Sequence, residues 1–274
     1  MVRVLGVSKS GYYAWRKRPQ SKRHNYNTYL IKEIKKAYQK SHRNYGSPRI
    51  YQDLKEQGIP AGRHRVARLM REHYIVARTK KRYKRYTATA HGRTHFDNLV
   101  QKNFLVDQPN RLWASDITML WTGSGFLHVA VVMDLFSRRI IGWSMNSRIT
   151  DDLTINALRM AVGARKPKQD LIHHSDQGSQ YQSARFKKQL DKYRITGSMS
   201  YKGDCYDNAV VESFFKTLKS EWTKHNRYTN REEAMNSIFE FIEIYYNRQR
   251  RHSTLNYVSP VNFEKKQLQE KSVY

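Results

Sequence analysis

Three acidic residues stand where an acid could do chemistry. Asp116 lies in a run typical of a strand, where Asp is rare and costly to bury unpaired. Asp176 follows a short predicted strand and opens a polar loop, and Glu212 borders the apolar stripe of a predicted helix. Carboxylates from three elements could converge on divalent cations, since Mg²⁺ prefers hard oxygen ligands. Two such ions can activate an attacking oxygen and stabilise a leaving oxygen during in-line displacement.

Each acid also has an ordinary structural interpretation, which the sequence leaves open. Asp116 could accept a structural hydrogen bond, Asp176 could stabilise a turn, and Glu212 could pair with Lys216 four residues later. Lys216 and Lys219 share the helical face of Glu212, where they would meet a phosphate, although exposed lysines on helices are usually only solvated.

The elements that must position these acids read as a mixed α/β domain. Three strands joined by short connections are followed by alternating helices and strands, and the last third is helical. Strands are predicted at 112–121, 126–135, 139–145, 171–174 and 195–200, and helices at 150–163, 184–193, 209–222 and 232–246.

The N-terminal part carries a different pattern. Predicted helices at 30–39, 48–58 and 63–75, with a glycine-containing turn before the last, suggest a helix-turn-helix. The last helix places Arg63, Arg65, Arg68 and Arg71 largely outward, which favours DNA recognition. The alternative is a small helical bundle with a solvated basic face.

Charge and composition point to the same partner. The 274 residues carry a net charge of +28, and the first 105 hold 26 basic and 5 acidic residues, a balance of +21. Such a surface seeks polyanions. A single cysteine excludes an internal disulfide framework and zinc modules built on paired cysteines. With neither a membrane span nor a signal peptide in the pattern, we expect a cytoplasmic, DNA-associated protein.

These features divide the chain into five expected segments. They are a partial N-terminal helical segment at 1–20, a helix-turn-helix-like DNA-binding region at 21–78, a basic linker at 79–105, a catalytic core at 106–265 and a C-terminal tail at 266–274.

Several motifs together resemble a known family. Thirty-five residues separate Asp176 from Glu212, and with Asp116 they resemble the D,D(35)E core of retroviral-type integrases and insertion-sequence transposases. The runs at 113–118, 174–181, 207–209 and 212–215, with matches at Lys219, 246–248, 251–252 and 259–260, are similar to the second-reading-frame (orfB-type) transposases of the IS-three family. The resemblance spans nearly the whole chain.

The resemblance implies a ribonuclease-H-like mixed-sheet core preceded by a small all-helical helix-turn-helix region. It implies Mg²⁺, with Mn²⁺ as a possible substitute, held by Asp116, Asp176 and Glu212 as catalytic residues, and a DNA contact at Lys219. The implied activity is cleavage at the element's terminal inverted repeats and 3′-hydroxyl transfer into target DNA, by a homo-oligomer, alone or with an upstream-frame protein or a fusion to it. The alternatives are a DNA-binding repressor with an inactive core and a ribonuclease-H-like nuclease.

Three further groups receive competing interpretations. His173 and His174 could be metal ligands, or structural or phosphate-facing residues, and Asp134 could be a fourth ligand or a turn residue. A cluster of aromatic and cationic residues could contact DNA or form a solvated helix end; it comprises Tyr245, Tyr246, Arg248, Arg250 and Arg251.

Overall fold

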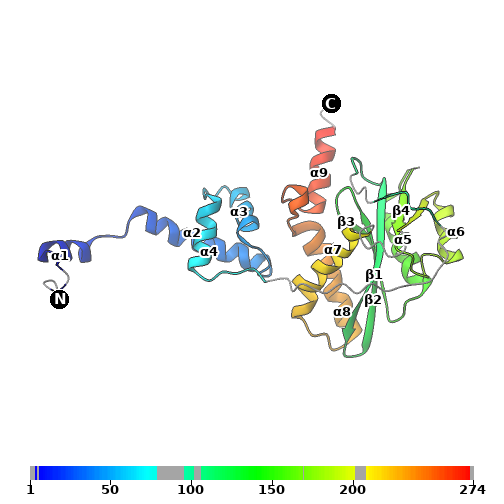
Figure 1. Cartoon of the computed structure of the whole chain (residues 1–274), viewed down its shortest axis with the longest axis horizontal. Helices are drawn as coiled ribbons and strands as arrows, with labels where there is room; N and C mark the ends of the chain where they lie inside the picture. The colour runs from blue at the N-terminus through cyan, green and yellow to red at the C-terminus, as the bar shows by residue number, and fades with distance from the viewer. Residues whose placement is uncertain are drawn as a thin grey trace. The chain divides into compact units, whose positions relative to one another are not determined.

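The computed structural model describes residues 4, 6–78, 96–101, 106–168, 170–200 and 208–271 (Figure 1). The chain forms two compact units, Met1–Arg78 and Thr79–Tyr274. Most of the expected basic linker lies outside the described residues. Within the described residues, no helix is long and apolar enough to cross a membrane.

The N-terminal unit is helical. Its helices are α1 (Lys9–Lys17), α2 (Lys22–Lys40), α3 (Ser47–Glu56) and α4 (Arg63–Glu72). α2 begins eight residues before the predicted helix at 30–39, because the Ser21 hydroxyl accepts the His24 N–H and caps a polar first turn that hydrophobic periodicity does not reveal. The apolar faces of α2, α3 and α4 form one core, whereas α1 buries no residue.

The second unit is built on a five-stranded sheet in the order β3-β2-β1-β4-β5. β1, β2 and β3 form an antiparallel meander, and β4 and β5 continue the sheet in parallel with β1. The strands are β1 (Leu112–Thr122), β2 (Gly125–Asp134), β3 (Arg139–Asn146), β4 (Ile172–Ser175) and β5 (Thr196–Met199). The sequence prediction of a mixed-sheet core after a helical region is confirmed.

The helices of this unit largely occupy the predicted segments, but two of them change geometry midway. α7 and α8 each pass into a π-helical stretch, η1 and η3. The bounds are α5 (Asp151–Arg165), α6 (Ala184–Lys192), α7 (Ala209–Thr217), η1 (Leu218–Trp222), the 3₁₀ turn η2 (Thr223–His225), α8 (Arg231–Phe239), η3 (Glu240–Gln249), the 3₁₀ turn η4 (Ser253–Leu255) and α9 (Pro260–Lys271). α9 continues through the expected start of the C-terminal tail at 266, so the core boundary does not fall at a helix end.

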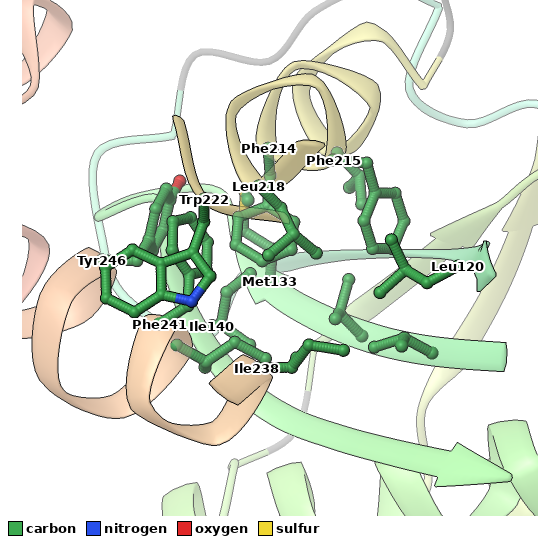
Figure 2. Close-up of a cluster of buried hydrophobic side chains, with 14 of the residues drawn as sticks. Leu120, Met133, Ile140, Phe214, Phe215, Leu218, Trp222, Ile238, Phe241 and Tyr246 are labelled. Carbon is green, nitrogen blue, oxygen red and sulfur yellow. The ribbon is translucent and has the colours of Figure 1, made fainter. Parts of the chain in front are cut away.

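The sheet buries both faces, and each face has its own core. α5 and α6 cover one face, whereas α7, η1, α8 and η3 cover the other (Figure 1). Phe214, Phe215 and Leu218 point from the α7–η1 segment toward Leu120 and Met133 of the sheet (Figure 2). Helix α7 is thereby packed on the β1 and β2 face, which determines where Glu212 can lie.

Candidate active site

Asp116 lies on β1, and Asp176 directly follows the adjacent parallel strand β4. Ala114 of β1 is aligned with His174 of β4, and Asp116 and Asp176 each come two residues later. Because side chains alternate along a strand, Asp116 shares the face of Ala114, which belongs to the core covered by α7. Glu212 stands in the first turn of α7 and is exposed. β1, the end of β4 and α7 therefore bring the three acids to one end of the sheet.

The groups that shift the pKa of Asp116 include the other two acids and Lys219. Burial, and next the charge of Asp176, raise the pKa of Asp116 to about 8. The Ile117 N–H, which donates to Asp116 Oδ1 at 2.7 Å, lowers it; Glu212 raises it and Lys219 lowers it. Two acids and one lysine from separate elements thus act on the Asp116 carboxyl.

Asp176 both stabilises a turn and lies close enough to Asp116 for its charge to affect that carboxyl. The Gly178 N–H donates to its Oδ1 at 3.0 Å, so the carboxylate stabilises the turn that follows β4. Burial raises the pKa of Asp176 and this hydrogen bond partly offsets the rise. One oxygen builds the turn while the charge still acts on Asp116.

This donor set suits a divalent cation in part. Asp116 and Asp176 are hard oxygen donors whose ionisation is opposed by burial, a cost that a bound cation would offset. Within the described residues, however, no three His, Cys, Asp or Glu side chains are close enough together to hold a metal ion as they stand. The aspartate pair is the part of the site that fits, and Glu212 lies farther out.

The structure distinguishes the two lysines. Lys219, in η1, is partly buried; burial lowers its pKa and the charge of Asp116 raises it. Lys216 is exposed on α7. Of the two, Lys219 is the cation directed to the acids.

The arginines of α4 fall into two pairs. Arg63 and Arg71 are exposed. Arg65 donates through Nε to Asn27 Oδ1 at 2.9 Å and its guanidinium lies 4.9 Å from the Tyr26 ring centroid, and Arg68 forms an ion pair with Glu72. Arg65 and Arg68 are therefore half-buried and bonded, Arg65 to α2 and Arg68 to the next turn of α4, whereas Arg63 and Arg71 are the more exposed pair.

The sequence analysis missed a basic hollow in the same unit. It has a volume of about 630 Å³ and lies between the first turns of α2 and α4. Its lining residues are Lys22, Arg23, Tyr26, His64, Arg65 and Arg68. The hollow escaped prediction because α2 was expected to begin only at residue 30.

The two histidines and Asp134 have structural roles. His173 pairs with Ser115 Oγ at 2.7 Å and His174 Nδ1 with Ser198 Oγ at 2.9 Å, both fully buried. Burial, then the neighbouring His174, lower the pKa of His173 to about 3, so it is neutral. Asp134 accepts the N–H groups of Asn110 and Phe136, as expected of a turn residue.

The aromatic and cationic cluster is a core element, so both of its expected interpretations are wrong for most members. Tyr245 and Tyr246 are buried. Arg250, also buried, makes a double hydrogen bond to Glu221 at 2.7 and 2.8 Å. Arg251 donates to the Tyr257 carbonyl at 2.8 Å, and Arg248 remains exposed. Arg250 pairs with a residue 29 positions earlier, so the residues next to it in sequence could not predict this contact.

Comparison with known proteins agrees with this arrangement. A family model described as HTH-like domain matches residues 26–83, and two described as Integrase core domain match residues 106–205 and 193–260. A helix-turn-helix-like domain followed by an integrase core defines a DNA transposase or integrase, a polynucleotidyl transferase of the DDE type.

Relatives identify the family. The chain is 41% identical to the transposase InsF for insertion sequence IS3A of Escherichia coli (strain K12), over 98% of this chain and 94% of that protein. It is also 41% identical to the insertion element IS600 uncharacterized 31 kDa protein of Shigella sonnei, over 97% and 98%. The HTLV-2 integrase catalytic core in complex with magnesium is similar at a TM-score of 0.44 and 18% identity, covering 57% of this chain and 96% of that one. The chain belongs to the IS3 family of transposases, as its motifs predicted, and a repressor with an inactive core is not favoured.

Proposed function

We propose that this transposase binds the terminal inverted repeats of its own element, hydrolyses a phosphodiester bond there, and joins the freed 3′-hydroxyl to target DNA. Asp116, Asp176 and Glu212 are the catalytic acids. The observation that supports this assignment is that the charges of Asp176, Glu212 and Lys219 all shift the pKa of Asp116. This requires β1, the turn after β4 and the α7–η1 segment to meet. End cleavage and strand transfer, measured separately on element-end DNA, test it.

The proposed cofactor is Mg²⁺, with Mn²⁺ as a substitute. Asp116 and Asp176 would hold it, and Glu212 would join them directly or through a water. When bound, the cation supplies activation of the attacking oxygen and stabilisation of the leaving oxygen. The Ile117 and Gly178 N–H groups each lower the pKa of the aspartate that they bond, which offsets part of the rise caused by burial. Lys219 presents a cation to the adjoining phosphate.

Lys219 provides the first prediction. Lys219→Ala is expected to lower strand transfer roughly 10- to 100-fold, because a cation beside the scissile phosphate is lost. Lys219→Arg should retain part of the rate, since the charge survives with a different geometry. Strand-transfer rates at saturating Mg²⁺ decide. Lys216→Ala is the matched control on the exposed side of α7, and a wild-type rate for Lys219→Ala would return Lys219 to a solvated role.

We propose that recognition of the element ends resides in the segment 21–78, joined to the core at 106–265 through the linker at 79–105. Arg63 and Arg71 are the exposed contacts, and the basic hollow holds a backbone phosphate with Arg65 and Arg68 at its wall. We also propose a homo-oligomer on DNA, with or without an upstream-frame protein.

Salt dependence tests the DNA contact. Arg63→Ala and Arg71→Ala should each reduce the slope of log affinity against log salt by about 1 if the side chain touches phosphate. Either should instead relax sequence preference if it touches a base edge. Fluorescence titration of end DNA across a salt series gives both readings. Lys265→Ala, at an exposed position of α9, removes the same charge, and an equal effect there would refute the assignment.

A further inference from the structure

Asn208 makes an unusual contact at the start of α7. It occupies the N-cap position of the helix that carries Glu212 and is 6% exposed. Its side-chain Nδ2 donates to the Ser115 carbonyl oxygen at 3.1 Å. Ser115 directly precedes Asp116 in β1, so the amide of Asn208 is bonded to the strand at the first catalytic acid.

The backbone of the same residue reaches a second acid. The Glu212 N–H donates to the Asn208 carbonyl oxygen at 3.2 Å, which begins the hydrogen bonding of α7. The peptide before Asp116 is therefore linked to the Glu212 peptide through one side chain and one carbonyl. The hydrogen bond from Asn208 to Ser115 is buried at the sheet–helix contact, where a hydrogen bond is little weakened by water.

Asn208 makes this contact in place of the usual capping bond. An N-cap Asn normally turns its side-chain oxygen to an N–H of the first helical turn. Asn230 does so at α8, where Oδ1 accepts the Glu233 N–H at 2.8 Å. Among the described residues, no side chain caps α7. Helix α7 thus begins without a side-chain cap from the described residues, and the amide of its N-cap residue is bonded to β1 instead.

We infer that Asn208 is a positioning residue that fixes Glu212 relative to Asp116. The Ser115 carbonyl can only accept a hydrogen bond, so Asn208 must present its NH₂ group to it, and a side chain without a donor cannot replace it. This inference rests on the proposed role of the three acids. It adds that their spacing depends on one hydrogen bond between β1 and α7.

The expected effect is on turnover. Asn208→Asp keeps the shape but replaces the donor with an oxygen that repels the Ser115 carbonyl, so the first turn of α7 shifts away from β1. Misplacement of a catalytic group by about 1 Å can cost roughly 100-fold in rate. We expect kcat for end cleavage to fall 10- to 100-fold, with KM for end DNA unchanged, because recognition lies in the other unit.

Asn247 provides a matched control. It is also a buried asparagine bonded to a strand, donating to the Ile140 carbonyl at 2.9 Å and accepting the Ile140 N–H at 3.0 Å, but it joins η3 to β3. Asn247→Asp should lower thermal stability at least as much as Asn208→Asp while leaving kcat per folded molecule near wild type. If Asn247→Asp lowers kcat equally, Asn208 has only a general stabilising role and the inference fails.

The experiment uses the full chain and measures kcat, KM, melting temperature and metal-free hydrogen exchange at residues 208–215. Faster exchange in this segment for Asn208→Asp, and not for Asn247→Asp, is expected independently of activity. Should Asn208→Asp not fold, Asn208→Ala, which removes the donor without adding a charge, gives the same measurements. Wild-type kcat and exchange in a folded Asn208 variant overturn the inference while leaving the acids in place. Full activity of Asp116→Asn would instead refute the proposed function.

Discussion

Asp116→Asn, Asp176→Asn and Glu212→Gln should each abolish both end cleavage and strand transfer while DNA binding persists. Each change keeps the side-chain shape and removes one charge from a site that needs several to hold a cation. Loss of a single electrostatic group from an active site typically costs about 10²–10³ in rate. We expect at least this for the two aspartates, which lie side by side on β1 and at the end of β4.

The measurement pairs two assays on each variant: product formation on labelled end DNA with Mg²⁺ or Mn²⁺, and binding of the same DNA without metal. Asp152→Asn is the control, because Asp152 is an exposed acid paired with Arg185 on the opposite face. Retention of full activity by any one variant removes that residue from the catalytic set. Parallel loss of binding would indicate misfolding instead.

The strands could be predicted because their signals are local. Alternating or continuous apolar runs locate β1, β2 and β3 to within a residue or two, and the polar loop after β4 marks Asp176. The sequence could also name the three acids, since their spacing and neighbours resemble a family. Their meeting at one end of the sheet required the parallel pairing of β1 with β4, which no local pattern encodes.

Long-range polar contacts account for what could not be predicted. Arg65 is an arginine on a basic helix in sequence, but in space it is bonded to Asn27. Asn208 looks like an ordinary helix cap until its amide is seen to reach Ser115, 93 positions away. In each case a polar side chain is used by a partner far along the chain, so its neighbours in sequence do not reveal its role.

The ion pair between Arg250 and Glu221 gives the largest expected effect on stability. Both side chains are 4% exposed, and the guanidinium binds both carboxylate oxygens. Removing one partner leaves an uncompensated buried charge, which typically costs about 3–5 kcal/mol. Arg250→Met is therefore expected to destabilise the catalytic unit by about that amount, measured as the free energy of unfolding in urea.

The double variant Glu221→Met with Arg250→Met separates a buried charge from a packing defect. Replacing both partners by apolar side chains removes the two charges together, so much of the lost stability should return. Arg185→Ala, which breaks an exposed pair with Asp152, should change stability by only about 0.5 kcal/mol. If Arg250→Met lowers the free energy of unfolding as little as Arg185→Ala does, the Arg250–Glu221 pair does not stabilise the catalytic unit.

The same pair bears on catalysis through its position. Glu221 lies in η1 two residues after Lys219, and Arg250 follows the end of η3, so the pair joins the segment that carries Lys219 to the C-terminal helices. Below its unfolding temperature, Arg250→Met should therefore lower strand transfer more than DNA binding, as is expected of Lys219→Ala. The double variant should regain stability but only part of the rate, because apolar contacts fill the space without fixing η1 through a two-point hydrogen bond. Equal recovery of stability and rate in the double variant would show that η1 needs only packing to present Lys219.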